Sequence, residues 1–166
     1  MKKRCMVLLV DNNAGVLTRV SSLFVQRGFN IDSLAVSPTE NERLSRLTIM
    51  TTGDEKTFNQ IIKQTGKLIE TRLIFSVEPA FSMVRELMLA KYRATGKDAE
   101  GLCEIIAAHG GKVADSSEGC TVAQLSDAPE VLDKFLSSAK DAGYELIELC
   151  RSGAIAMERG DVTYEL

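Results

Sequence analysis

The sequence predicts an α+β fold made of two similar units in tandem. Along the 166 residues, six segments follow the order strand, helix, strand, strand, helix, strand, and the same order then occurs a second time. Glycines and short polar clusters separate the segments, as expected where helices and strands end. We therefore expect two ferredoxin-like (βαββαβ) domains, residues 1–79 and 80–166, each with an antiparallel sheet covered on one face by two helices.

The first repeat is defined by its hydrophobic periods. A continuous apolar run at Cys5–Val10 predicts a buried strand, and apolar residues at helical spacing follow it until Gly28. A hairpin comes next, its turn containing Pro38 and Asn41, and Asp54 is expected to cap the second helix. The predicted strands and helices are, in order, residues 5–10, 16–27, 29–37, 44–52, 55–69 and 71–77.

The second repeat begins after a linker at Pro79–Arg85. Its first helix is expected to stop at Gly110-Gly111, its hairpin turns at Glu118-Gly119, and its second helix stops at Gly143. No element is predicted for Arg151–Asp161. The predicted strands and helices are residues 86–94, 99–107, 112–116, 120–125, 131–139 and 145–150.

Composition and charge exclude several classes of function. The net charge is −3 and no basic block occurs, which argues against a nucleic-acid partner. Apolar runs reach five or six residues, far below the roughly 20 that span a bilayer, and the N-terminus does not resemble a signal peptide. The four cysteines form no C-x-x-C pair, so we expect buried, reduced thiols and a cytoplasmic protein.

A polar loop between the first strand and the first helix is the strongest candidate for a ligand site. It reads Asp11-Asn12-Asn13-Ala14-Gly15-Val16-Leu17. Amides at a helix start favour an anion, and Gly15 lets a ligand approach the backbone closely. Asn12 and Asn13 can donate hydrogen bonds, and Asp11 can face an ammonium group. The loop is thus able to hold an amino-acid zwitterion, although such residues are also common in turns that bind nothing.

Asn30 is the second candidate, because it is a polar residue in a segment that is otherwise strand-like. Alone, it is expected at a solvent-facing or edge position, since Asn is rare inside strands. Together with the loop, it forms a plausible second wall of a pocket. Ile31 would then supply an apolar contact for a branched side chain.

Signals of catalysis are few. The single histidine, His109, lies at a predicted helix end, where a structural role is expected. No zinc-protease, nucleophile-elbow, Walker or dinucleotide-binding motif occurs. We therefore predict no catalytic residue, no metal site and no cofactor.

Several motifs are similar to one known family. VLLVDNNAGVLTRVSSLFVQRGFNIDSLAVSPTE, followed by LSRLTIMTTGDE, resembles the N-terminal ACT domain of acetohydroxyacid synthase (acetolactate synthase) small subunits. RELMLAKYRA and CRSGAIAMERGD resemble the first strand of that family's second domain and its C-terminal signature. The resemblance covers nearly the whole chain, although the part after Lys97 diverges more.

The resemblance implies a regulatory chain that binds a catalytic, thiamine-diphosphate-dependent large subunit. Such chains raise catalytic activity and confer feedback inhibition by valine. Their ACT domains pair edge to edge as a homodimer, and the effector lies between the loop of one chain and the second strand of the other. Carried over to this sequence, the valine-binding residues are Asn12, Ala14, Gly15, Val16 and Leu17 from one chain, with Asn30 and Ile31 from its mate.

Two alternatives belong to other functional classes, and a third is a regulator of a different enzyme. A phosphate-cradling enzyme of acylphosphatase type needs an arginine aimed into the loop, and none lies between Arg4 and Arg19. A nucleic-acid module needs aromatic residues on its central strands, which the first and third strands lack. The nearest competitor is an ACT-domain regulator of another metabolic enzyme.

Overall fold

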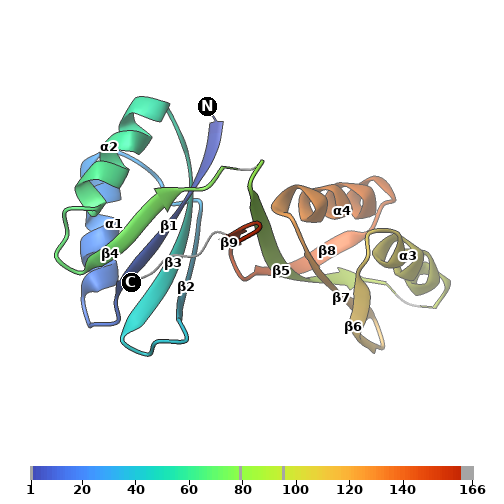
Figure 1. Ribbon diagram of the computed structural model, residues 1–166. Helices are drawn as coiled ribbons and strands as arrows, with labels where there is room; N and C mark the ends of the chain where they lie inside the picture. Colours follow the sequence, from blue (N-terminus) through green and yellow to red (C-terminus); the bar gives the residue numbers. More distant parts are fainter. Residues whose placement is uncertain (1, 79, 95, 162–166) are drawn as a thin grey trace. The chain divides into compact units, whose positions relative to one another are not determined.

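The computed structural model describes residues 2–78, 80–94 and 96–161 (Figure 1). Contacts divide the chain into two compact units, one formed by residues 1–83 with 154–166 and the other by residues 84–153. The elements are β1 (Lys2–Asp11), α1 (Val16–Gln26), β2 (Ser33–Pro38), β3 (Leu44–Gly53), α2 (Glu55–Thr65), β4 (Thr71–Ser76), β5 (Ser82–Arg93), α3 (Lys97–Ala108), β6 (Lys112–Ser117), β7 (Cys120–Asp127), α4 (Pro129–Asp141), β8 (Glu145–Arg151) and β9 (Ile155–Glu158).

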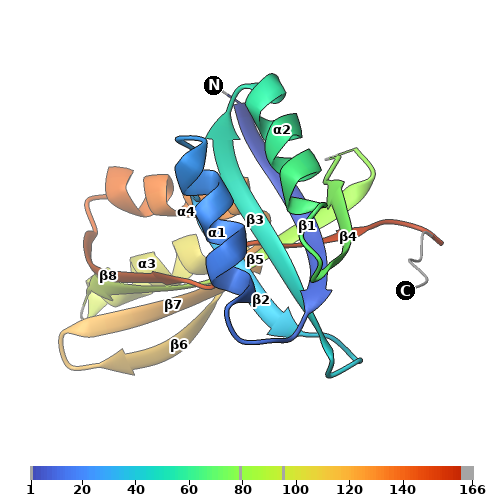
Figure 2. The ribbon, with the colours of Figure 1, turned by 90° about the vertical axis from the view of Figure 1, so that its left-hand side faces the viewer.

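The first unit is an antiparallel sheet in the order β2-β3-β1-β4, with α1 and α2 on one face. Leu8 of β1 lies opposite Leu47 of β3 and Ile74 of β4, so three adjacent strands bring apolar side chains together beneath the helices. Helix α1 lies nearer the β2 edge and α2 nearer the β4 edge (Figure 2). The predicted βαββαβ order is confirmed, and β2 is an edge strand.

The second unit repeats the plan with strand order β6-β7-β5-β8 and helices α3 and α4. Ala90 of β5 lies opposite Ala123 of β7 and Leu149 of β8. The small side chains of Ala90 and Ala123 leave room in the core for larger side chains. Tyr92 packs edge-on against Phe135 there, with ring centroids 6.0 Å apart. The predicted ferredoxin-like fold is confirmed here as well.

A ninth strand follows the second repeat, where the sequence predicted no element. Strand β9 pairs with β5, and the amide of Arg159 donates to the carbonyl of Phe81 at 2.8 Å. The Ala154 amide donates to Ser33 Oγ at 3.1 Å, and Arg46 Nη2 donates to the Ala156 carbonyl at 2.7 Å. The segment from residue 154 therefore belongs with the first unit, whereas the sequence predicted one boundary between residues 79 and 80.

Three further expectations differ from the structure. Strand β2 begins at Ser33, so residues 29–32 are not part of the predicted strand 29–37. Gly28 has φ of 67° after the end of α1, and the Phe29 amide bonds back to the Phe24 carbonyl, which prolongs the turn. Cys150 is exposed, contrary to the expectation of buried thiols, because it lies on the edge strand β8. The predicted linker Pro79–Arg85 is too long, because β5 begins at Ser82, and Pro79 lies outside the described residues.

Candidate functional site

The loop from β1 to α1 is held in place by main-chain and side-chain hydrogen bonds to the neighbouring turn. The Asn12 amide donates to the Arg43 carbonyl at 2.8 Å, and Asn12 Nδ2 donates to the Glu42 carbonyl at 3.0 Å. Asn12 therefore fixes the loop with the amide that was predicted to donate to a ligand. Asn13, Ala14 and Gly15 are exposed.

Gly15 precedes α1 in the left-handed conformation, with φ of 84° and no side-chain cap on the helix. The first amides of a helix lack intrahelical partners and carry its positive dipole end. A Cβ at Gly15 would lie 3.5 Å from Arg19 Nη1, so the Arg19 guanidinium stands beside the loop. Val16 is buried in the core, and Leu17 is 43% exposed. The start of α1 thus combines amides, a guanidinium and an exposed leucine.

Arg19 is the residue that sequence reasoning missed. Its guanidinium lies 2.5 Å from Glu70 Oε1, which holds it beside the helix start. The signal was present in the spacing, since residues i and i+4 share one face of a helix and Arg19 is four positions after Gly15.

Asp11 does not have the role expected from the sequence. Its two carboxylate oxygens each accept a hydrogen bond of 2.7 Å from the Arg72 guanidinium. The pair raises the pKa of Arg72, first through the hydrogen bond and then through the charge of Asp11. Asp11 thus joins the end of β1 to the start of β4 and is not left to meet an ammonium group.

Asn30 and Ile31 lie in the turn before β2. Asn30 is exposed, and its Nδ2 donates to Asp32 Oδ1 at 3.0 Å, while Thr51 Oγ1 donates to the Asn30 carbonyl at 2.6 Å. The side-chain oxygen of Asn30 therefore remains as its acceptor. Ile31 is half-buried and packs against the first core.

The two groups of predicted residues stand at opposite ends of α1. This helix has 11 residues and is therefore about 16 Å long at about 1.5 Å per residue. One chain does not bring the loop and Asn30 to the same small ligand. A site that uses both groups needs a second copy of the chain.

His109 has the structural role that the sequence suggested. It ends α3, with Nδ1 2.9 Å from the Ile105 carbonyl, Nε2 3.4 Å from Ser138 Oγ, and its ring edge-on to Phe135. Because a carbonyl only accepts, the contact with Ile105 places the proton on Nδ1, and Ser138 donates to Nε2. The contact joins α3 to α4.

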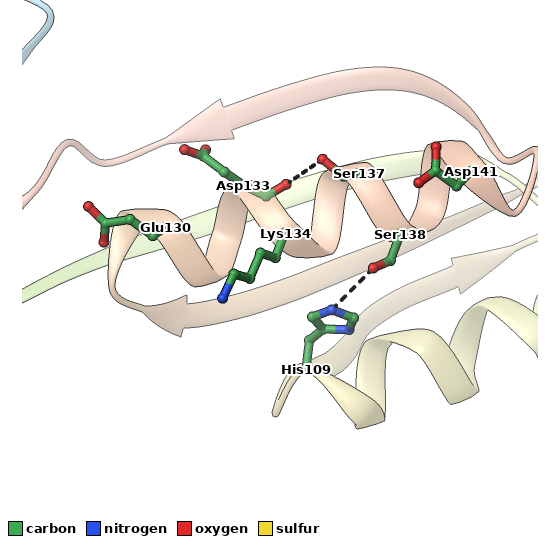
Figure 3. A pocket seen from close by; sticks show the side chains of 7 residues that line it. All are labelled: His109, Glu130, Asp133, Lys134, Ser137, Ser138 and Asp141. Atoms are coloured by element: carbon green, nitrogen blue, oxygen red, sulfur yellow. Dashed lines mark hydrogen bonds between the residues drawn. The ribbon is translucent and has the colours of Figure 1, made fainter.

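A cavity of about 490 Å³ lies beside His109 and is lined mainly by polar residues of α4 (Figure 3). Ser138 extends toward the histidine ring, and Ser137 bonds the Asp133 carbonyl of its own helix. This serine and histidine lack the carboxylate that orients a catalytic dyad, since a main-chain carbonyl takes that place. Within residues 2–78, 80–94 and 96–161, no cluster of His, Cys, Asp or Glu is arranged to hold a metal ion, and no helix could cross a membrane.

Comparisons with known proteins agree along the chain. Residues 6–72 match the AHAS small subunit-like ACT domain, and residues 85–160 match the small subunit of acetolactate synthase. The chain is 38% identical over 159 residues to the acetolactate synthase isozyme 3 small subunit of Salmonella typhimurium, covering 96% of this chain and 97% of that protein. It is 36% identical over 159 residues to a probable acetolactate synthase small subunit of Archaeoglobus fulgidus, covering 96% and 98%.

A solved structure gives the same result in three dimensions. The crystal structure of the acetolactate synthase small subunit from Thermotoga maritima superposes with a TM-score of 0.86 at 32% identity, covering 98% of this chain and 100% of that one. The two matched segments together cover most of the chain, and these relatives are of similar length. The chain belongs to the family of small, regulatory subunits of acetolactate synthase.

Proposed function

We propose that this chain activates the thiamine-diphosphate-dependent large subunit of acetolactate synthase and makes it sensitive to feedback inhibition by valine in the cytoplasm. As a member of its family, the chain is a non-catalytic subunit, and catalysis lies in the large subunit. The observation that carries the proposal is the helix start at Gly15, where α1 has no side-chain cap and the Arg19 guanidinium lies beside the loop, an arrangement that suits an anion in the ACT domain.

The site requires a homodimer paired through β2. This strand is one of the two edges of the first sheet, and a two-fold axis beside it would join two sheets edge to edge. The axis reverses the direction of α1 in the mate, so the start of one α1 approaches the end of the other. Asn30, which follows that end, then comes near the loop of the second chain.

Each part of valine has a complementary group in this arrangement. The carboxylate meets the amides at the start of α1 and the Arg19 guanidinium. The ammonium group donates to the side-chain oxygen of Asn30 from the mate, because Asp32 already binds the Asn30 amide nitrogen. Ile31 of the mate and the exposed Leu17 offer apolar contact for the branched side chain.

Reconstitution tests the proposal. We expect the purified chain to form no acetolactate from pyruvate alone, to raise the rate of a purified large subunit, and to render that rate sensitive to valine. If the chain activates the large subunit but valine does not change the rate, the chain is a regulator and the proposed valine site is wrong. Failure to bind or activate any acetolactate synthase large subunit from the same organism would contradict the partner, and co-purification with another enzyme would favour an ACT-domain regulator of that enzyme.

A further inference from the structure

The carboxylate of Glu70 lies beside the candidate valine site but outside the segments predicted to form it. Glu70 belongs to the turn between α2 and β4, and its side chain is 16% exposed. Its Oε1 atom lies 2.5 Å from Nη2 of Arg19, which is in the first turn of α1. The ion pair therefore joins a third segment of the first unit to the helix start.

The turn that carries Glu70 is tied to the strand that ends in the loop. The Asp11 amide donates to the Glu70 carbonyl at 2.9 Å, and Arg72 donates twice to the Asp11 carboxylate. On the other side, Thr71 Oγ1 donates to the Thr65 carbonyl at 2.8 Å, which fixes the turn to the end of α2. Because both neighbouring elements hold Glu70, its carboxylate has a defined place relative to the loop.

The two ends of the Arg19 guanidinium face different groups. Nη2 meets Glu70, whereas Nη1 lies 3.5 Å from the place that a Cβ on Gly15 would occupy. A guanidinium is a planar, rigid fork, so fixing one end sets the direction of the other. With Nη2 on Glu70, Nη1 is directed at the space beside Gly15, where the first amides of α1 also lie.

Without Glu70, Arg19 would hold this place less well. Its side chain is 48% exposed, and an arginine that is not held populates many rotamers. A ligand that binds such an arginine must immobilise it, which lowers the affinity, whereas a side chain already in place avoids this loss. The charge of Glu70 opposes the gain only weakly, because the positive guanidinium stands between the two carboxylates and offsets their repulsion.

We propose that Glu70 is a positioning residue of the valine site, which holds Arg19 so that Nη1 receives the carboxylate of the ligand. This role rests on the valine site proposed above. It gives that site a component that neither the loop nor Asn30 of the mate supplies. The affinity for an amino-acid carboxylate then depends on the turn between α2 and β4.

Substitutions at Glu70 test the positioning role on the full chain. Glu70→Ala removes the contact with Arg19 and should lower the affinity for valine, measured by calorimetry, about two- to tenfold. Glu70→Gln keeps an oxygen that accepts from Nη2 and should retain most of the affinity. The control is Glu55→Ala, which removes a 3.5 Å ion pair with Arg4 at the other end of β1 from the loop and should not change the affinity.

The Arg19 side chain gives two readouts that a merely structural role of Glu70 would not move. In the absence of valine, ¹⁵N relaxation of Arg19 Nε should show an ordered guanidinium in the wild type and in Glu70→Gln. In Glu70→Ala the guanidinium should be mobile, while the backbone amides of the loop keep their chemical shifts. In a chain that carries Arg19→Gln, adding Glu70→Ala should lower the valine affinity no further, because the residue that Glu70 positions is gone.

The outcomes separate the positioning role from the valine site itself. Unchanged or stronger valine binding in Glu70→Ala, an Arg19 side chain equally ordered with and without Glu70, or a further loss in the double variant would each overturn the positioning role. If the wild type binds valine and Gly15→Asp does not, while Glu70→Ala binds as the wild type does, only the positioning role is wrong. If the wild type binds no valine, the proposed valine site is wrong, and the positioning role is wrong with it.

Discussion

Gly15 has a left-handed backbone conformation and lies at the positive end of α1. Two substitutions there can separate the effect of shape from the effect of charge. An Asp at this position would place a carboxylate beside the position proposed for the valine carboxylate and would also attract the Arg19 guanidinium. Like charges about 4 Å apart repel by roughly 1–4 kcal/mol, depending on the local dielectric. We expect Gly15→Asp to raise the valine concentration for half-inhibition about tenfold or more, with activation of the large subunit retained. Acetolactate formation in the reconstituted enzyme measures both.

Gly15→Asn is the matched control, since it has nearly the same shape without the charge. Both residues tolerate positive φ better than other side chains, so their strain at φ of 84° should be similar. Equal loss of valine inhibition in the two variants would assign the effect to shape or strain. Loss of activation in Gly15→Asp would mean that the loop serves assembly.

Asp54 makes a second prediction at the residue scale. The Thr57 amide donates to Asp54 Oδ1 at 2.8 Å and lowers the pKa of this carboxyl. A lowered native pKa means that the charged form stabilises the fold above the unfolded pKa of about 3.9, and that this stability disappears as the pH falls through the native value. The melting temperature of Asp54→Ala should therefore lie below that of the wild type at pH 7, and the difference should shrink below about pH 4. A constant difference from pH 7 to pH 2.5 would contradict this account of the cap.

At the scale of elements, β9 links the end of the described chain to the first unit. Ala154 and Ala156 are 1% and 4% exposed, and β9 receives the Arg46 hydrogen bond. A chain that ends after Gly153 should lose amide-exchange protection in β2 and β3 by about tenfold or more, since each lost hydrogen bond contributes about 0.5–1.5 kcal/mol. A chain that ends after Asp161 keeps β9 and serves as the control. Equal protection in both chains would show that β9 does not stabilise the first sheet.

The elements also show how far sequence patterns reach. The continuous apolar run at Cys5–Val10 predicted its strand correctly, because all six residues are buried and the run itself marks the segment. Strand β9 was missed because its four residues are too few for a period, and its partners are far away in sequence. Strand β2 was predicted too long because Phe29 has the character of a strand residue, whereas its ring lies where a Cβ at Gly53 would be. Such long-range packing leaves no local signal.

The candidate site was predictable to a similar extent. The loop and its glycine were visible in the sequence because turn residues have local causes. The pairing of Asp11 with Arg72 depends on strand β4, and the ion pair of Arg19 with Glu70 depends on the turn before β4. No local pattern joins these partners to the loop, although the spacing of Gly15 and Arg19 already indicated one shared face.

At the scale of the whole molecule, the central claim is that the valine site is shared between two copies of the chain. Because α1 separates the loop from Asn30 by about 16 Å, neither group alone completes the site. In a two-fold dimer, each site takes the loop of one chain and Asn30 of the other. Damage to either group in every chain therefore removes both sites.

Complementation between two inactive variants measures this directly. Homodimers of Gly15→Asp and of Asn30→Ala should each lose valine binding, as followed by calorimetry. After co-expression, a mixed dimer contains one site with both substitutions and one intact site, so that random pairing restores about a quarter of the wild-type number of valine sites at wild-type affinity. A mixture that binds no more valine than its two parents, although mixed dimers are present, would contradict a site shared between chains.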